Sequence, residues 1–259
     1  MIGLEPVIDL VHTVLWSGQV EGERPLSLIL IAPPGSGKTS VLEMLECPVA
    51  YFASDLTSRE IKMVLKKNGA HSHIMLGDFT AVFSRARGTA KLTINLLGRL
   101  TGDKITHMPW DGDELAIPRK LGFISAIPPD DLAKREVRSH VQGAGFASRF
   151  LFAKYNYTQQ TITDVHKFIR EGKYKTAKKF VINIKPGAYK VTVPDSIALQ
   201  INQISDRIKT DPLGFRAHHH LRTLACSIAR KNARNTVTVE DVKQLIEFCD
   251  FFTTEGKRI

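Results

Sequence analysis

The sequence has 259 residues, of which 43% are hydrophobic and 24% charged, so it can bury a core and is unlike a disordered, collagen-like or disulfide-scaffold chain. No apolar run approaches the ~18 to 20 residues that span a bilayer, and we expect no membrane partner. Lysine and arginine number 36 against 26 aspartates and glutamates, and the net charge of +10 favours a polyanion such as nucleic acid as a partner.

The N-terminal residues and the cysteines bear on the compartment. Glu5 and Asp9 stand where a signal peptide would carry positive charge. Cys47, Cys226 and Cys249 are far apart and form no CxxC pattern, which is typical of reduced thiols. We therefore expect a cytoplasmic protein.

The first part of the sequence alternates between apolar runs and helical patterns. Short apolar runs predict buried strands at residues 26–31, 49–52, 74–76 and 121–126. The spacing of apolar residues predicts helices at residues 6–16, 40–45, 58–67 and 90–100. Strands that alternate with helices predict an α/β fold, in which helices cover both faces of a parallel sheet.

The pattern changes after Tyr157. We predict helices at residues 163–171, 196–209, 215–232 and 239–252, and a β-hairpin near 180–193. Thr238 and Asp241 form a capping box before the last helix. We therefore place a domain boundary that gives an α/β core over residues 1–156 and a mostly helical domain over residues 157–259.

The sharpest motif is APPGSGKT at residues 32–39, which lies between a predicted strand and a predicted helix. In a phosphate-binding loop, glycines let backbone N–H groups turn toward the anion, a lysine reaches the terminal phosphates and a hydroxyl holds Mg²⁺. The positive end of the helix dipole adds to this. Ala32 replaces the first glycine of the usual GxxxxGK[ST] pattern. The motif predicts that ATP or GTP is bound by Pro34, Gly35, Ser36, Gly37, Lys38, Thr39 and Ser40.

A second motif, IMLGD at residues 74–78, is an apolar strand that ends in a carboxylate. We expect Asp78 to hold Mg²⁺ together with Thr39. The next residue is Phe79, whereas many related hydrolases carry a glutamate there that polarises the attacking water. Hydrolysis is therefore slow or relies on another carboxylate, for which Asp55 is a candidate.

With these motifs the sequence resembles the AAA+ ATPases, and within them the MCM helicase branch and related phage or plasmid replication ATPases. Besides the phosphate loop, three stretches carry the resemblance. Residues 95–128 read as a helix, a hairpin and a strand that ends before a proline. Residues 145–151, GFASRFL, are similar to the MCM segment that supplies an arginine finger, and residues 216–248 are similar to the lid helices. The resemblance implies an AAA+ P-loop core with a smaller helical lid.

The resemblance also implies roles for single residues. Arg149 becomes the arginine finger that reaches a neighbour's ATP, which requires a homo-oligomer such as a hexameric ring. Arg216 becomes the sensor of the γ-phosphate within its own subunit, with Arg222 as the substitute. MCM proteins carry a sensor asparagine where this sequence has Ile127, and Ser125 is the nearest polar residue.

The function implied is an ATP hydrolase that uses Mg²⁺ and works on DNA, as a helicase motor or a helicase loader in replication or recombination. A replication protein is then a further partner. The predicted hairpin offers Lys104, Trp110 and Lys120 to DNA. Two alternatives stay open. One is an AAA+ remodeller of proteins, of the MoxR or chelatase type, and the other is a nucleotide-dependent switch with weak hydrolysis.

Overall fold

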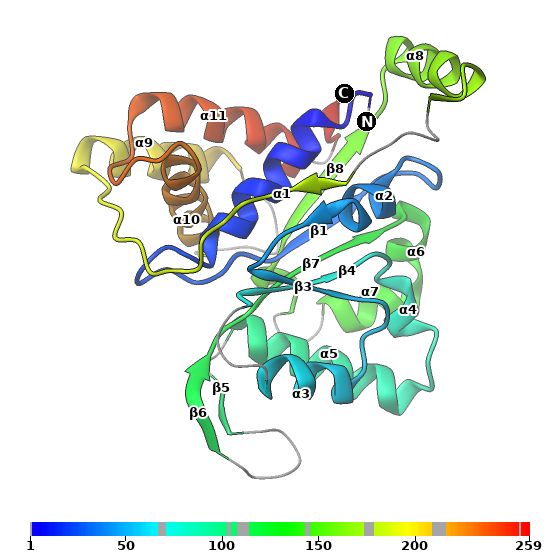
Figure 1. The fold of residues 1–259 in the computed structure, drawn as a ribbon, viewed down its shortest axis with the longest axis horizontal. Helices are drawn as coiled ribbons and strands as arrows, with labels where there is room; N and C mark the ends of the chain where they lie inside the picture. The colour runs from blue at the N-terminus through cyan, green and yellow to red at the C-terminus, as the bar shows by residue number, and fades with distance from the viewer. Residues whose placement is uncertain are drawn as a thin grey trace.

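A computed structural model describes residues 2–66, 71–102, 105–107, 114–142, 146–173, 179–208, 216–253 and 255–259. Its centre is a six-stranded sheet in the order β10-β8-β1-β7-β4-β3, in which every pair of neighbours is parallel (Figure 1). The strands are β1 Leu28–Ile31, β3 Ala50–Ala53, β4 His73–Leu76, β7 Gly122–Ile127, β8 Leu151–Asn156 and β10 Lys257–Arg258. The predicted α/β class with a parallel sheet is confirmed.

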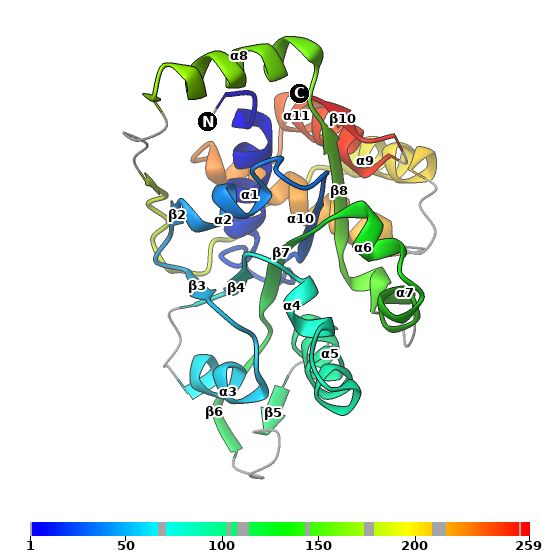
Figure 2. The ribbon, with the colours of Figure 1, turned by 90° about the vertical axis from the view of Figure 1, so that its right-hand side faces the viewer.

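Helices cover both faces of the sheet because its side chains alternate between two apolar cores. In β1, Leu28 and Leu30 belong to one core, whereas Ile29 and Ile31 belong to the other. Figures 1 and 2 show the resulting three layers. The first core also contains residues of α1 Glu5–Ser17, α2 Lys38–Glu43, α9 Asp195–Arg207, α10 Arg216–Lys231 and α11 Val239–Cys249. The second contains residues of α3 Ser58–Lys66, α4 Thr80–Phe83, α5 Arg87–Gly102 and α7 Arg135–Gln142.

Several shorter elements complete the described chain. The helix α8 Gln159–Arg170 extends away from the sheet (Figures 1 and 2). The helix α6 Pro129–Ala133 follows β7. Short 3₁₀ turns are η2 Ala147–Arg149 and η4 Asp250–Phe252. Among the described residues, no helix is long and apolar enough to cross a membrane.

Most elements predicted in the first part of the sequence are confirmed, with shifts of a few residues at their ends. The helix after the phosphate loop ends at Glu43, because Leu45 and Glu46 form the short strand β2. The strands β5 Ile105–His107 and β6 Glu114–Arg119 pair antiparallel, which confirms the hairpin expected before β7. The prediction missed β8, the strand that lies beside β1.

The hairpin predicted near residues 180–193 is not formed, and this prediction was wrong. Phe180–Val181 forms a short strand, β9, that pairs in parallel with β2. Further along, the N–H of Tyr189 donates to Gln19 O at 2.7 Å, and that of Thr192 donates to Asn235 O at 2.9 Å. The backbone N–H groups of Phe180, Ile182, Tyr189 and Thr192 are therefore satisfied by three distant parts of the chain rather than across a hairpin.

The C-terminal helices pack on the same core as α1. The capping box of Thr238 and Asp241 is present at the start of α11, as predicted. Leu224 and Leu245 are buried in the core that also contains Leu28. The strand β10 extends the sheet beside β8. The domain boundary placed near residue 156 stays a prediction.

Candidate phosphate-binding site

The order of the strands identifies one edge of the sheet as the place for a ligand. After β1, the chain continues into α2, which packs in the first core. After β7, the strand next to β1, the chain continues through α6 into α7, which packs in the second core. Chain segments that leave neighbouring parallel strands toward opposite faces open a crevice beyond the carboxyl ends of those strands. The phosphate loop lies at this edge because it follows β1 directly.

The backbone of the phosphate loop has the geometry that its glycines predict. Gly35 and Gly37 have φ of +74° and +76°, in the left-handed region that other residues rarely adopt. The N–H of Ser36 donates to Pro33 O at 3.3 Å, which closes the turn. The helix α2 begins at Lys38, immediately after the second glycine. The N-terminus of α2 is therefore directed toward the centre of the phosphate loop.

The Lys38 side chain lies inside the loop and is only 7% exposed. Its ammonium donates to Ala32 O at 2.6 Å and to Pro33 O at 2.7 Å, with Ser36 Oγ at 3.4 Å. Burial lowers the pKa of Lys38, and the charges of Asp78 and Asp131 oppose this shift. The ammonium is thus held in the loop by neutral carbonyl oxygens.

Two tyrosines support the loop from one side, Tyr155 in β8 and Tyr157 directly after that strand. Tyr155 Oη and Tyr157 Oη both donate to Ser36 O, at 3.3 and 2.7 Å. Burial raises the pKa of both phenols, so each keeps the proton that it donates. Leu4 closes the same side, because a Cβ atom on Gly37 would lie 3.0 Å from Leu4 Cδ1. Sequence reasoning missed these residues, although tyrosines two apart on a strand point to the same face.

The predicted Mg²⁺ ligands lie close together where β4 ends and α2 begins. Thr39 Oγ1 donates to Gly77 O at 3.4 Å, and Gly77 precedes Asp78. Asp78 Oδ1 accepts the N–H of Thr80 at 2.9 Å, and its side chain is exposed. A hydroxyl and a carboxylate at this edge are oxygen ligands of the kind that Mg²⁺ prefers. The donor set therefore fits the metal that the motif predicts.

The residue after Asp78 faces away from this edge. Phe79 is 1% exposed and packs against the rings of Phe83, Phe123 and Phe146, with centroids 4.9, 5.5 and 6.2 Å away. A carboxylate at this position would be buried among aromatic rings, which is costly. This packing gives a structural reason for phenylalanine here.

The predicted sensor Ser125 is fully buried within the sheet. Its hydroxyl donates to Leu76 O on the neighbouring strand, at 2.8 Å. It shares its side of β7 with Phe123 and Ile127, which belong to the second core, whereas the loop helix α2 packs in the first. The structure therefore does not bring Ser125 to the loop.

Arg149 and Arg216 lie together at the opposite end of the sheet. Arg216 Nη1 donates to Ser148 Oγ at 3.0 Å. Leu151 pairs with Leu28, so Arg149 lies near the start of β1, whereas the loop follows its end. At about 3.3 Å per residue, six residues of strand separate Arg149 from the loop by roughly 20 Å. Arg216 is therefore not close to the loop of its own chain, where the resemblance had assigned it.

The two arginines line a cavity of about 520 Å³. Other basic side chains join them, namely Arg24, His219 and His220. His220 Nε2 donates to Ser148 O at 3.1 Å, and Arg24 Nη1 donates to Gly102 O at 2.8 Å. Its three arginines provide hydrogen-bond donors with positive charge, and Glu23 on its wall is bound to Arg222. It is suited to an anion.

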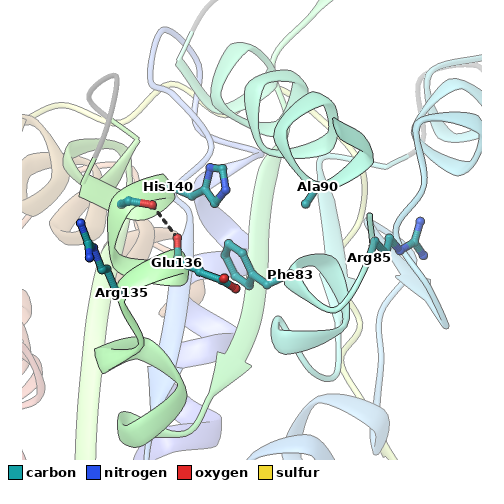
Figure 3. Close-up of a pocket in the computed structure, with 7 residues that line it drawn as sticks. Phe83, Arg85, Ala90, Arg135, Glu136 and His140 are labelled. Atoms are coloured by element: carbon teal, nitrogen blue, oxygen red, sulfur yellow. Dashed lines mark hydrogen bonds between the residues drawn. The ribbon is translucent and has the colours of Figure 1, made fainter. Parts of the chain in front are cut away.

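A second cavity of about 520 Å³ lies between α4 and α7 (Figure 3). Arg135, Glu136 and His140 of α7 line one side, and Phe83 lies opposite. Arg85 points away from these side chains and pairs with Asp55.

The last of the predicted site residues are those that the sequence assigned to DNA. Lys104 and Trp110 lie outside the described residues, and Lys120 lies between β6 and β7, directly after Arg119.

The fold and the loop together define an α/β protein whose six-stranded parallel core is compatible with that of phosphate-loop proteins. The sequence matches no known family profile and no curated protein.

Proposed function

We propose that the chain is an oligomeric AAA+-type ATPase that couples ATP binding and hydrolysis to work on DNA, as a helicase motor or a helicase loader. One observation carries this proposal. Gly35 and Gly37 adopt left-handed conformations between β1 and α2, with the Lys38 ammonium inside the loop and Asp78 at the adjoining edge. This combination is suited to a nucleoside triphosphate.

The chain's own groups supply the chemistry of binding. Backbone N–H groups at the start of α2 donate to phosphate oxygens. The Lys38 ammonium exchanges the neutral carbonyls of Ala32 and Pro33 for charged oxygens, which form stronger hydrogen bonds. Mg²⁺ held by Thr39 and Asp78 supplies positive charge to the phosphoryl oxygens.

The position of the arginines supports an oligomer. Because Arg149 and Arg216 lie near the start of β1, they are suited to a nucleotide held by a neighbouring copy. A contact between the loop end of one copy and the arginine end of the next is heterologous, and such contacts form a ring when the rotation from copy to copy closes. In this proposal both arginines act across the interface.

The DNA part of the proposal rests on charge and on the β5–β6 hairpin. The chain carries a net charge of +10, and the antiparallel hairpin directly precedes β7, as the resemblance to MCM proteins implies. A basic protein with a projecting hairpin is suited to a phosphate backbone.

The test is ATP turnover with and without single-stranded DNA. We expect DNA to stimulate turnover and Lys38→Ala to abolish it, while Lys243→Ala, an exposed lysine on α11, leaves it unchanged. If no DNA stimulates ATP turnover, the proposal that the protein works on DNA is wrong. Stimulation by a protein partner together with indifference to DNA would support a remodeller of proteins.

A nucleotide-dependent switch is the second candidate, and the burial of Phe79 favours it. The usual glutamate is missing, so the protein would bind ATP and hydrolyse it slowly. Tight ATP binding with negligible turnover in the assembled oligomer would select this function over the motor.

A further inference from the structure

The edge formed by Thr39 and Asp78 has a third polar side chain, that of Glu43. A Cβ atom on Gly77 would lie 3.0 Å from Thr39 Cγ2 and 3.7 Å from Glu43 Oε1. Gly77 accepts the hydrogen bond of the Thr39 hydroxyl and immediately precedes Asp78. The Glu43 carboxylate therefore lies beside the residues that fit Mg²⁺.

The sequence of α2 explains this position. Glu43 follows Thr39 by four residues, and residues with this spacing share one face of a helix. Helical side chains also lean toward the N-terminus, which here is the phosphate loop. Val41 and Leu42 are buried in the first core and fix the rotation of the helix. Glu43 is exposed and directed along the face that carries Thr39.

The Glu43 carboxylate is also available. Within the described residues it makes no hydrogen bond or ion pair. Two other carboxylates are engaged, namely Asp55, the candidate from the sequence, and Asp131, whose charge acts on Lys38. Asp55 pairs with Arg85, and Asp131 Oδ1 accepts from Lys134 Nζ at 2.5 Å. Phe79, where a glutamate is usual, is buried among aromatic rings.

We propose that Glu43 is the catalytic residue that accepts a proton from the water attacking the γ-phosphate. This inference rests on the proposed ATPase function and supplies the carboxylate that position 79 lacks. It also implies that the protein is a motor rather than a slow switch.

The step balances without a further reactant. The water oxygen forms a bond to the γ-phosphorus, and the bond between that phosphorus and the β–γ bridging oxygen breaks. The bridging oxygen keeps the electron pair and leaves with ADP. The water proton passes to the Glu43 carboxylate, which later releases it to solvent.

The experiment compares Glu43→Gln with two matched variants, Glu46→Gln and Asp131→Asn. Glu46 is an exposed glutamate three residues further along, paired with Lys179, and Asp131 is the alternative carboxylate near Lys38. Each variant is assayed for single-turnover hydrolysis and for affinity for a fluorescent ATP analogue. We expect Glu43→Gln to slow hydrolysis by about 100-fold or more, while its affinity stays within about threefold of wild type.

The matched variants should hydrolyse ATP at nearly the wild-type rate. Retained ATP binding by Glu43→Gln shows that the loop is folded, so a loss of hydrolysis cannot be assigned to misfolding. Wild-type hydrolysis by Glu43→Gln, or a greater loss in Asp131→Asn, would overturn this inference and leave the proposed ATPase intact. Absence of turnover by the wild-type protein, with ATP bound, would overturn both.

Discussion

At the scale of single residues, the phosphate loop depends on backbone conformations that a side chain disfavours. Gly35 has φ of +74°, and a Cβ atom placed on it would meet no atom within 4 Å. The cost of replacing it is therefore conformational and not steric. Gly172, after α8, has φ of +68° and equally open surroundings, far from the loop in the sequence.

These two glycines give a matched pair of variants. We expect Gly35→Ala and Gly172→Ala to destabilise the fold by similar amounts, about 1 kcal/mol each, because both force a left-handed alanine. Only Gly35→Ala should also weaken ATP binding, since it shifts the N–H groups that face the phosphates. Thermal denaturation and ATP titration measure the two effects. Equal ATP affinities in the two variants would contradict the assignment of the loop.

His73 is a buried titratable residue at the start of β4. It is fully buried, with Nε2 3.2 Å from Leu26 O and Nδ1 3.0 Å from Ser72 Oγ. A Cβ atom on Gly122 would lie 2.3 Å from its ring, so the space around it is filled. Burial lowers the pKa of His73 to about 4.

This pKa shift predicts a stability that falls in mild acid. Between about pH 6.5 and pH 4, the unfolded chain binds a proton at residue 73 and the folded chain does not, so stability is lost as the pH falls through this range. The loss from this group is at most about 3 kcal/mol. Urea unfolding between about pH 4.5 and pH 7 should give a smaller pH dependence for His73→Gln than for wild type. Parallel curves would exclude His73 as the cause.

At the scale of elements, the aromatic residues after β4 join that strand to its covering helices. Phe79 contacts Phe83 of α4, Phe123 of β7 and Phe146, which precedes η2. The backbone N–H of Phe79 also donates to Ala126 O at 2.8 Å. The position is therefore structural, although in the sequence it is adjacent to a predicted Mg²⁺ ligand.

We expect Phe79→Glu to destabilise the protein instead of restoring a usual active site. Burying a carboxylate among rings should lower the free energy of unfolding by about 4 kcal/mol or more. Phe79→Leu keeps an apolar side chain and should cost about 1 to 2 kcal/mol. Urea denaturation of the two variants distinguishes these values. A stable Phe79→Glu protein with faster hydrolysis would refute the structural role.

The strands of the sheet were predictable where they are short, apolar and bounded by turn residues, as in β1, β4 and β7. The strand β8 was missed because it alternates between buried and partly exposed side chains, in the sequence LFAKYN. The segment after β9 was misjudged because Pro186-Gly187 indicates a turn but does not determine which backbone groups the flanking residues pair with.

The candidate site was predictable where one short motif contains it. The loop glycines, Lys38 and Thr39 are close in sequence, so spacing alone identified them. Tyr157 contacts the site only through the fold, since its partner Ser36 belongs to a distant part of the chain. Glu43 is four residues from Thr39 on the same helix, but its place beside Gly77 also depends on how α2 packs against the end of β4. Arg216 was assigned to its own loop by resemblance, and only the register of β1 with β8 revealed the distance.

At the scale of the whole molecule, the two ends of the sheet differ in charge and in chemistry. The loop end carries Asp78 and Glu43 beside the phosphate loop, and the other end carries Arg149 and Arg216 around a cavity. In the proposed oligomer the loop end of each copy contacts the arginine end of the next.

Mixing inactive variants tests this arrangement. Lys38→Ala and Arg149→Ala should each hydrolyse little ATP alone. In an equal mixture, about a quarter of the interfaces join an intact loop to an intact Arg149, so about a quarter of the wild-type activity should return. A mixture of Lys38→Ala with the Lys38→Ala/Arg149→Ala double variant is the control and should stay inactive. No recovery in the first mixture would mean that Arg149 does not act across an interface.

The central position of β1 has a consequence for how the protein is made. Leu28 pairs with Ile124 on one side and Leu151 on the other, so both neighbours of this early strand are synthesised long after it. Pairings between distant segments close large loops and slow folding. While the ribosome completes the chain, LILI stays an unpaired apolar stretch, which makes nascent protein prone to aggregation and a natural client for chaperones.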